Sequence, residues 1–100
     1  MKTRLRCTVY PGQFPSELAV IVQSFEGREY SLFAQKRDVI TDEVPSDDHP
    51  VYGWVNVQIV SEERALYLVQ LPCTTLESGR FLTVQGGQLE RTPVLAEATT

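Results

Sequence analysis

The sequence predicts an all-β fold: a small antiparallel barrel of five or six strands, SH3-like or OB-like, with a compact β-sandwich as the alternative. The chain contains twelve Val, three Ile, nine Thr and nine aromatic residues but only five Ala, and branched and aromatic side chains favour strands. Short apolar or alternating stretches are separated by Gly, Pro and acidic residues, as in an antiparallel sheet. A sheet of this size protects its edges best by curling closed.

One domain is expected, because 100 residues with 42% hydrophobic side chains can build one core but not two. We assign residues 1–91 to this domain and residues 92–100 to a frayed C-terminal tail. The expected elements are strands at residues 2–10, 18–25, 28–36, 51–60, 65–71 and 80–85, and one helical turn at residues 88–91.

The first half of the chain reads as three strands and a loop. In residues 2–10, polar and charged side chains alternate with apolar ones, which indicates one solvated and one buried face. The apolar run at residues 18–25 predicts a central strand covered on both faces, and Glu26-Gly27 predicts a hairpin turn after it. Residues 37–50 are rich in Asp and Pro and predict a long surface loop, with a short element at Val39-Ile40.

The second half of the chain reads as three further strands. In residues 51–60, side chains alternate so that the inward set is Val55, Val57 and Ile59. A polar turn at residues 61–64 leads into the returning strand, which ends at Pro72. A loop precedes the last strand, and Gly86-Gly87 ends that strand.

Charge is distributed unevenly along the chain. Residues 1–37 carry a balance of +3, residues 38–63 a balance of −7, and residues 64–100 a balance of zero, which sums to −4. Phosphate contacts need clustered Lys and Arg, so this acidic balance makes nucleic acid an unfavoured partner.

No membrane association is expected, because the longest apolar run, Leu18–Val22, is too short to span a bilayer. The charged residues 1–6 are not followed by an apolar segment, so we expect a cytoplasmic protein. Cys7 and Cys73 are 66 positions apart; we expect both to remain reduced, with Cys7 in the core.

The favoured functional hypothesis is a non-enzymatic binding or accessory module that contacts a protein partner or a second copy of itself. Aromatic side chains supply contact area and amides supply both donors and acceptors, so we expect one outward row of such residues to bind. That row is Tyr52, Trp54, Asn56 and Gln58. Trp54 either belongs to this exposed row or caps the end of the core.

Single-stranded nucleic-acid binding is the first alternative. It requires basic residues of two strands to adjoin with an aromatic ring between them, so that phosphates and a stacked base are held together. The residues concerned are Arg4, Arg6, Arg28, Tyr30 and Lys36. Protection of the sheet edges by charge is the simpler explanation of these residues.

A small enzyme that uses the acidic loop is the second alternative, with His49 as a general base beside Asp47 or Asp48. No serine lies in a Gly-x-Ser-x-Gly context, and catalysis is the less favoured hypothesis. The acidic residues of the loop lack the spacing and the glycine of a calcium loop, so we expect no metal and no cofactor. Those acidic residues are Asp38, Asp42, Glu43, Asp47 and Asp48.

Overall fold

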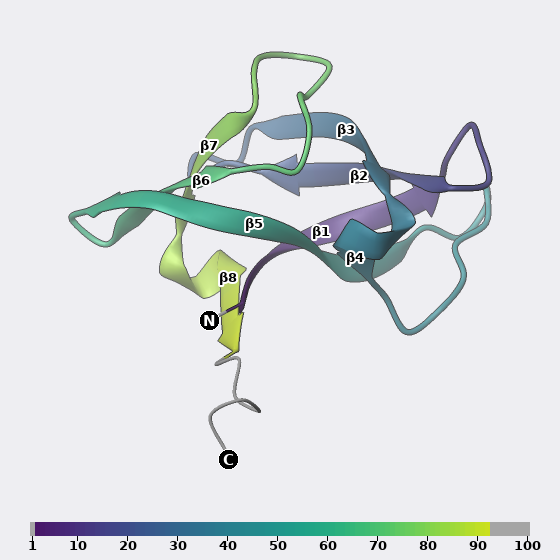
Figure 1. The fold of residues 1–100 in the computed structure, drawn as a ribbon, viewed down its shortest axis with the longest axis horizontal. Coiled ribbons are helices and arrows are strands. Elements are labelled where there is room, and N and C mark those ends of the chain that lie inside the picture. The colour runs from purple at the N-terminus through teal and green to yellow at the C-terminus, as the bar shows by residue number, and fades with distance from the viewer. Residues whose placement is uncertain (1, 93–100) are drawn as a thin grey trace.

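The computed structural model describes residues 2–92, which form one antiparallel sheet curled into a half-barrel (Figure 1). Its strands are β1 (Lys2–Pro11), β2 (Glu17–Gln23), β3 (Glu29–Gln35), β4 (Val39–Ile40), β5 (Val51–Glu63), β6 (Leu66–Gln70), β7 (Phe81–Gln85) and β8 (Leu89–Thr92), with 3-10 turns η1 (Lys36–Asp38) and η2 (Gly86–Gln88). The strand order is β3-β2-β1-β5-β6-β7, with β4 added to β5 and β8 added to β1. The predicted small all-β fold is confirmed. Within residues 2–92, neither 3-10 turn is long enough or apolar enough to cross a bilayer.

Strand β1 organises the sheet because it has different neighbours along its length. Residues Thr3–Val9 pair with β5 on one edge. On the other edge, residues Thr8–Pro11 pair with β2, whereas residues Lys2–Leu5 pair with β8. Figure 1 shows the start of β1 lying against β8, which brings the two ends of the described chain together.

The core occupies the concave side of the sheet and is built almost entirely from Val and Leu. Every second residue of each main strand contributes to it, as the period-two pattern predicts. Burying each such side chain contributes about 1.5–3 kcal/mol before chain entropy is set against it. The side chains with less than 2% exposure and the largest volumes are Leu5, Leu32, Leu71, Val9, Val20, Val22, Val55, Val69 and Val84.

Strand β2 differs from expectation because only one of its faces is covered. Val20 and Val22 are buried with the core, whereas Ala19 and Ile21 on the opposite face are partly exposed. The expectation of a strand covered on both faces is wrong, because a single curled layer has no second sheet to cover its convex side.

Strand β5 is longer than predicted. It continues to Glu63 through a bulge between Ile59 and Ser61, and the turn to β6 is confined to Arg64 and Ala65. Both turn residues have positive φ, 56° and 67°. The bulge lets β5 bend, so that one strand pairs with β1 in its first half and with β6 in its second.

The predicted helical turn at residues 88–91 is wrong. The chain turns earlier, in η2, and residues Leu89–Thr92 form β8. Leu89 packs against the core opposite Leu5, and this apolar contact extends the segment along β1. Thr92, assigned to the tail from sequence, ends this strand; the rest of the predicted tail lies outside the described residues.

A seam of single hydrogen bonds joins the β2–β3 hairpin to β7 and the segments on either side of it, across the open side of the half-barrel. The Phe25 amide donates to the Thr83 carbonyl at 2.9 Å, and the side-chain amide of Gln88 donates to the Gln23 carbonyl at 2.8 Å. These contacts replace the ladder that a fully closed barrel would have.

The loop between β6 and β7 covers the free edge of β3 in the same seam. The Leu76 amide donates to the Ser31 carbonyl at 2.8 Å, and the Ser31 amide donates to a carboxylate oxygen of Glu77 at 2.6 Å. The Ser31 hydroxyl donates to the other carboxylate oxygen at 2.9 Å. The hydrogen bond from the Ser31 amide is the main cause that lowers the pKa of the Glu77 carboxylate.

Candidate functional site

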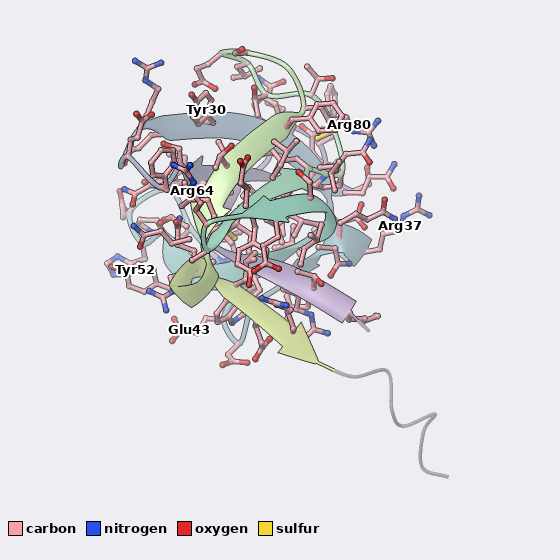
Figure 2. All side chains as sticks on the ribbon, turned by 90° about the vertical axis from the view of Figure 1, so that its left-hand side faces the viewer. Tyr30, Arg37, Glu43, Tyr52, Arg64 and Arg80 are labelled. Carbon is pink, nitrogen blue, oxygen red and sulfur yellow. The ribbon has the colours of Figure 1, made fainter. Side chains whose placement is uncertain are left out.

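The outer face of β5 carries the row of residues that the sequence predicts to bind. Tyr52, Trp54, Asn56 and Gln58 point outward, and they alternate with buried Gly53, Val55 and Val57. Tyr52 is 83% exposed, and Figure 2 shows it at the margin of the molecule, away from the core. Trp54 is half-buried on the same outer face, so it does not cap the end of the core.

The first half of this row lines a hollow of about 710 Å³. Tyr52 and Trp54 form one wall of it, and Arg4 and Arg6 of β1 extend beside them. The remaining lining comes from β4 and the segment after it, from β5 and from β8: Ile40, Thr41, Asp42, Gly53 and Glu90.

Arg6 is the free cation of this hollow. It lies opposite Trp54 in the β1–β5 ladder, and its guanidinium is 5.9 Å from the centroid of the indole ring, within cation–π range. Its side chain makes no hydrogen bond or ion pair within residues 2–92. The planar donors of Arg6 are therefore available to an incoming acceptor.

Arg4 is only partly satisfied. One of its terminal nitrogens, Nη1, is 3.4 Å from a carboxylate oxygen of Glu90, whose Cα is its partner in the β1–β8 ladder. Its Nε is buried and has no partner among the described residues. A buried donor without an acceptor is rare in proteins and often marks a place where a water or a ligand completes the set.

Gly53 allows β4 to form the far wall of the hollow. A Cβ at this position would lie 2.6 Å from the Ile40 carbonyl oxygen and 3.1 Å from a Val9 methyl group. Only a residue without a side chain lets β4 approach β5 this closely.

A second hollow, of about 470 Å³, continues from the first across the outer face of β1. Tyr52 and Arg6 line both hollows and stand at their junction. The continuation is lined in part by Ile21, Phe25 and Gln88. We name the two hollows together the aromatic–arginine groove.

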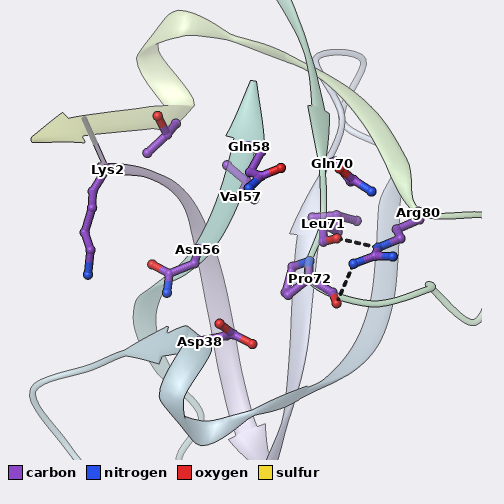
Figure 3. A pocket seen from close by; sticks show the side chains of 10 residues that line it. Lys2, Asp38, Asn56, Val57, Gln58, Gln70, Leu71, Pro72 and Arg80 are labelled. Carbon is purple, nitrogen blue, oxygen red and sulfur yellow. Dashed lines mark hydrogen bonds between the residues drawn. The ribbon is translucent and has the colours of Figure 1, made fainter. Parts of the chain in front are cut away.

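The second half of the predicted row, Asn56 and Gln58, lies in a different hollow of about 440 Å³ (Figure 3). We name it the polar hollow. Asn56 and Gln58 line it from β5, and the other polar side chains are those of Lys2, Thr3, Asp38, Gln70 and Arg80. The row predicted as one surface therefore serves two separate concavities.

The residues predicted for nucleic-acid binding are not brought together. Arg4 and Arg6 share the groove, but Tyr30 lies opposite Val22, points to the concave side and packs against the core. Arg28 and Lys36 lie at the two ends of β3, which β2 separates from β1. Leu32 and Ala34 alternate with the same parity as Tyr30, and this signal could have placed the ring inward from sequence.

His49 is exposed in the loop that follows β4, and its Nδ1 is 2.6 Å from the Asp48 carbonyl oxygen. Asp47 and Asp48 are also exposed. None of these three residues lines the groove or the polar hollow. Within residues 2–92, no three His, Cys, Asp or Glu side chains gather in a way that could hold a metal ion.

Both cysteines are free thiols. Burial raises the pKa of Cys7 to about 12, and burial is also the main cause that raises the pKa of Cys73. The Cys73 thiol donates a hydrogen bond to the Phe33 carbonyl at 3.1 Å. A raised pKa suppresses the thiolate, so neither cysteine is an activated nucleophile.

Comparison of the chain with family models, with curated proteins and with solved structures finds no match. Sequence reasoning missed the contributions of Glu90, Gln70 and Arg80, because these residues reach β1 and β5 only through the folded topology.

Proposed function

We propose that this domain is a non-enzymatic protein-binding module and that the aromatic–arginine groove holds its partner. The observation that carries the proposal is Tyr52, a large side chain left 83% exposed beside Trp54 and the unpaired Arg6. Tyr, Trp and Arg are the residues that most often dominate binding energy at protein interfaces. An exposed cluster of this kind on a small domain favours an interface.

The shape of the groove supports an extended segment of a partner as the ligand. Two adjoining hollows share Tyr52 and Arg6, so a chain crossing both would contact these residues at its centre. Ile21 and Phe25 offer apolar contacts at one end, and the guanidinium of Arg4 lies at the other. Such a segment would place an acceptor near Arg6 and an apolar side chain on Tyr52.

Single-stranded nucleic acid is supported less well. Only Arg4 and Arg6 of the five expected residues reach the groove, and Asp42 and Glu90 in its lining offset their charge. A backbone of phosphates needs a continuous basic track. Catalysis at His49 is also supported less well, because that residue is exposed and lies outside the groove and the polar hollow.

We further propose that the fold is SH3-like and that the protein is cytoplasmic. The order β8-β1-β5-β6-β7, with a 3-10 turn leading into the last strand, supports the SH3-like arrangement. Two unpaired cysteines, one of them deeply buried, support a reducing compartment. The partner is another protein or a second copy of the chain, and the experiment below separates these two.

Affinity capture with the immobilised full chain tests the proposal. Wild type, Tyr52→Ala and Phe14→Ala are compared on one extract of the source cells; Phe14 is an exposed aromatic residue outside the groove. We expect a protein, or the chain itself, to be retained by wild type and Phe14→Ala and lost from Tyr52→Ala. The captured protein is then purified and titrated against all three.

Two results would overturn the proposal. If the captured protein binds wild type and Tyr52→Ala with equal affinity, the contact lies outside the aromatic–arginine groove. Binding of a labelled single-stranded oligonucleotide that falls steeply with salt, and that Arg6→Ala abolishes, would assign the groove to nucleic acid instead.

A further inference from the structure

We propose that the polar hollow is a second, independent binding site, and that it takes the free carboxyl end of a peptide chain. It shares no lining residue with the aromatic–arginine groove, so it does not depend on the function proposed above. Three features carry the inference: a gap in the ladder of β5, a set of unpaired amides, and an anchored arginine.

The first feature is a two-residue gap along one edge of β5. β1 occupies the opposite edge of β5 through Val57. On the near edge, β4 pairs with Trp54 and Val55, and β6 begins to pair only at Gln58. Asn56 and Val57 therefore have no strand partner on this edge, and both line the polar hollow. Backbone groups left open at a sheet edge are a template for another chain.

The second feature is a group of three side-chain amides without partners. Asn56, Gln58 and Gln70 all line the polar hollow, and Gln58 lies directly opposite Gln70 in the ladder. None of the three makes a side-chain hydrogen bond within residues 2–92. Each amide offers both donors and an acceptor, so together they match the mixed pattern of a peptide group. Figure 3 shows Gln58 and Gln70 facing each other across the hollow.

The third feature is a cation held in a fixed position. The Nε of Arg80 donates to the Leu71 carbonyl at 2.8 Å, and its Nη2 donates to the Pro72 carbonyl at 3.1 Å (Figure 3). The Leu71 amide in turn donates to the Arg80 carbonyl at 2.8 Å. These bonds orient the guanidinium and leave its remaining N–H groups free for a carboxylate.

The charges around the polar hollow favour an anionic ligand. Lys2 and Arg80 contribute +2 and Asp38 contributes −1, which leaves +1 in a protein whose net charge is −4. Within residues 2–92, Lys2 and Asp38 form no ion pair with each other or with another side chain. Asp38 can accept a backbone N–H of the ligand while Arg80 binds its carboxylate, and Lys2, on the opposite side of the hollow in Figure 3, adds to the attraction.

The length of the gap selects a chain end over a continuous strand. Two residues of an extended chain span about 7 Å, and β4 and β6 block both ends of the gap. A chain that ran through would collide with one of these strands, whereas the last one or two residues of a peptide fit. The apolar lining from Leu71 and Pro72 can contact the terminal side chain.

A titration followed by 15N NMR tests the inference, with N-acetyl-Ala-Ala as the probe. The free acid is compared with the C-terminal amide and with acetate alone. We expect the free acid to shift the side-chain amide signals of Asn56, Gln58 and Gln70, with binding about tenfold or more tighter than the amide. Acetate, which lacks the peptide group, should bind correspondingly weakly.

Variants locate the site and provide the controls. Lys2→Gln and Arg80→Gln should each weaken binding of the free acid, whereas Arg64→Gln, an exposed arginine at the β5–β6 turn, should leave it unchanged. Arg80→Gln also removes two contacts of the loop, so Lys2→Gln provides the test that leaves the fold untouched. Equal binding of acid and amide, equal binding of acetate, no shift in these signals, or full binding by Lys2→Gln would each overturn the inference.

Discussion

Gly53 shows how one residue without a side chain sets the shape of the candidate site. It lies between Tyr52 and Trp54 in sequence, but its position faces the Val9 methyl group and the Ile40 carbonyl. The close approach of β4 that it allows brings Ile40 and Thr41 to the groove. The absence of a side chain at Gly53 thus determines where β4 and Thr41 line the groove beside Tyr52 and Trp54.

Gly53→Ala should destabilise the domain. The added Cβ would meet backbone at 2.6 Å, which a shift of β4 must relieve. We expect a loss of about 1–3 kcal/mol in the free energy of unfolding, measured by urea denaturation. Gly87→Ala is the matched control, because nothing lies within 4 Å of its Cβ position, and it should change stability by less than about 0.5 kcal/mol. Equal midpoints for the two variants would refute this role of Gly53.

The sequence predicts which side chains are buried where polar and apolar residues alternate regularly along a strand. It fails for Tyr30, which is assigned to a site because of the charged residues near it in sequence. Leu5, Val55 and Val57 are buried as their parity predicts. The nucleic-acid hypothesis joins Tyr30 to basic residues, yet Tyr30 shares parity with buried Leu32 and packs against the core on the concave side. Apolar parity is the stronger signal, because burial of the apolar side chains fixes which face of a strand points inward.

At the scale of elements, the β5–β6 hairpin has a turn that its residues do not favour. Arg64 and Ala65 both adopt left-handed backbone conformations. Two-residue hairpin turns with positive φ at both positions prefer Asn-Gly. This turn type favours neither Arg nor Ala, so the pairing of the flanking strands β5 and β6 determines the conformation of the turn.

Replacing Arg64-Ala65 by Asn-Gly should stabilise the protein. Relief of the left-handed strain should outweigh the extra flexibility of glycine, for a gain of about 0.5–1 kcal/mol per position. The measurement is thermal unfolding by circular dichroism. Arg28→Asn, at an exposed arginine without positive φ, should leave the melting temperature nearly unchanged. A melting temperature that stays the same or falls in the Asn-Gly variant would contradict the assigned turn.

Element boundaries are predictable from turn residues except at the end of β5 and near the C-terminus. The sequence places the strands within a few residues of their observed positions and anticipates the short element at Val39-Ile40. It does not anticipate β8, because four residues carry too little pattern to separate a strand from a turn. The contact that decides the matter, Leu89 against Leu5, joins opposite ends of the chain.

At the scale of the whole molecule, the half-barrel is held shut by the seam between the β2–β3 hairpin and the segments around β7, and not by a ladder. Few of its hydrogen bonds are backbone-to-backbone, and one acceptor is the carboxylate of Glu77. Regions held by few contacts open locally at lower free energy than the core. The seam should therefore open before the β1–β5 ladder does.

Acidification should loosen this seam. The pKa of Glu77 is lower in the folded state than in the unfolded state. The ionised carboxylate therefore contributes its full stabilisation above the ordinary glutamate pKa, and this stabilisation is lost as the pH falls through the lowered pKa. Hydrogen exchange of the Leu76 amide, expressed as a protection factor, should show protection that decreases over that pH range. In Glu77→Gln, protection should already be reduced at neutral pH, while Glu63→Gln should behave as wild type. Unchanged protection of Leu76 in Glu77→Gln would contradict this account of the seam.

The candidate sites themselves were only partly predictable. The outward row on β5 could be identified, because alternation within one strand is a local pattern. Its division into two hollows could not, since the polar hollow combines residues as distant in sequence as Lys2, Asp38, Asn56 and Arg80. Strand order and the bend of β5 bring these residues together, and neither is encoded within a short window of sequence.

The central claim is that the inner face of β5 holds the fold while its outer face is free for contact. The free energy of unfolding of Tyr52→Ala, measured beside Val55→Ala, tests this claim most directly. Val55 is fully buried, so its truncation should cost about 2 kcal/mol or more, whereas Tyr52→Ala should stay within about 0.5 kcal/mol of wild type. A loss in Tyr52→Ala as large as that in Val55→Ala would contradict it.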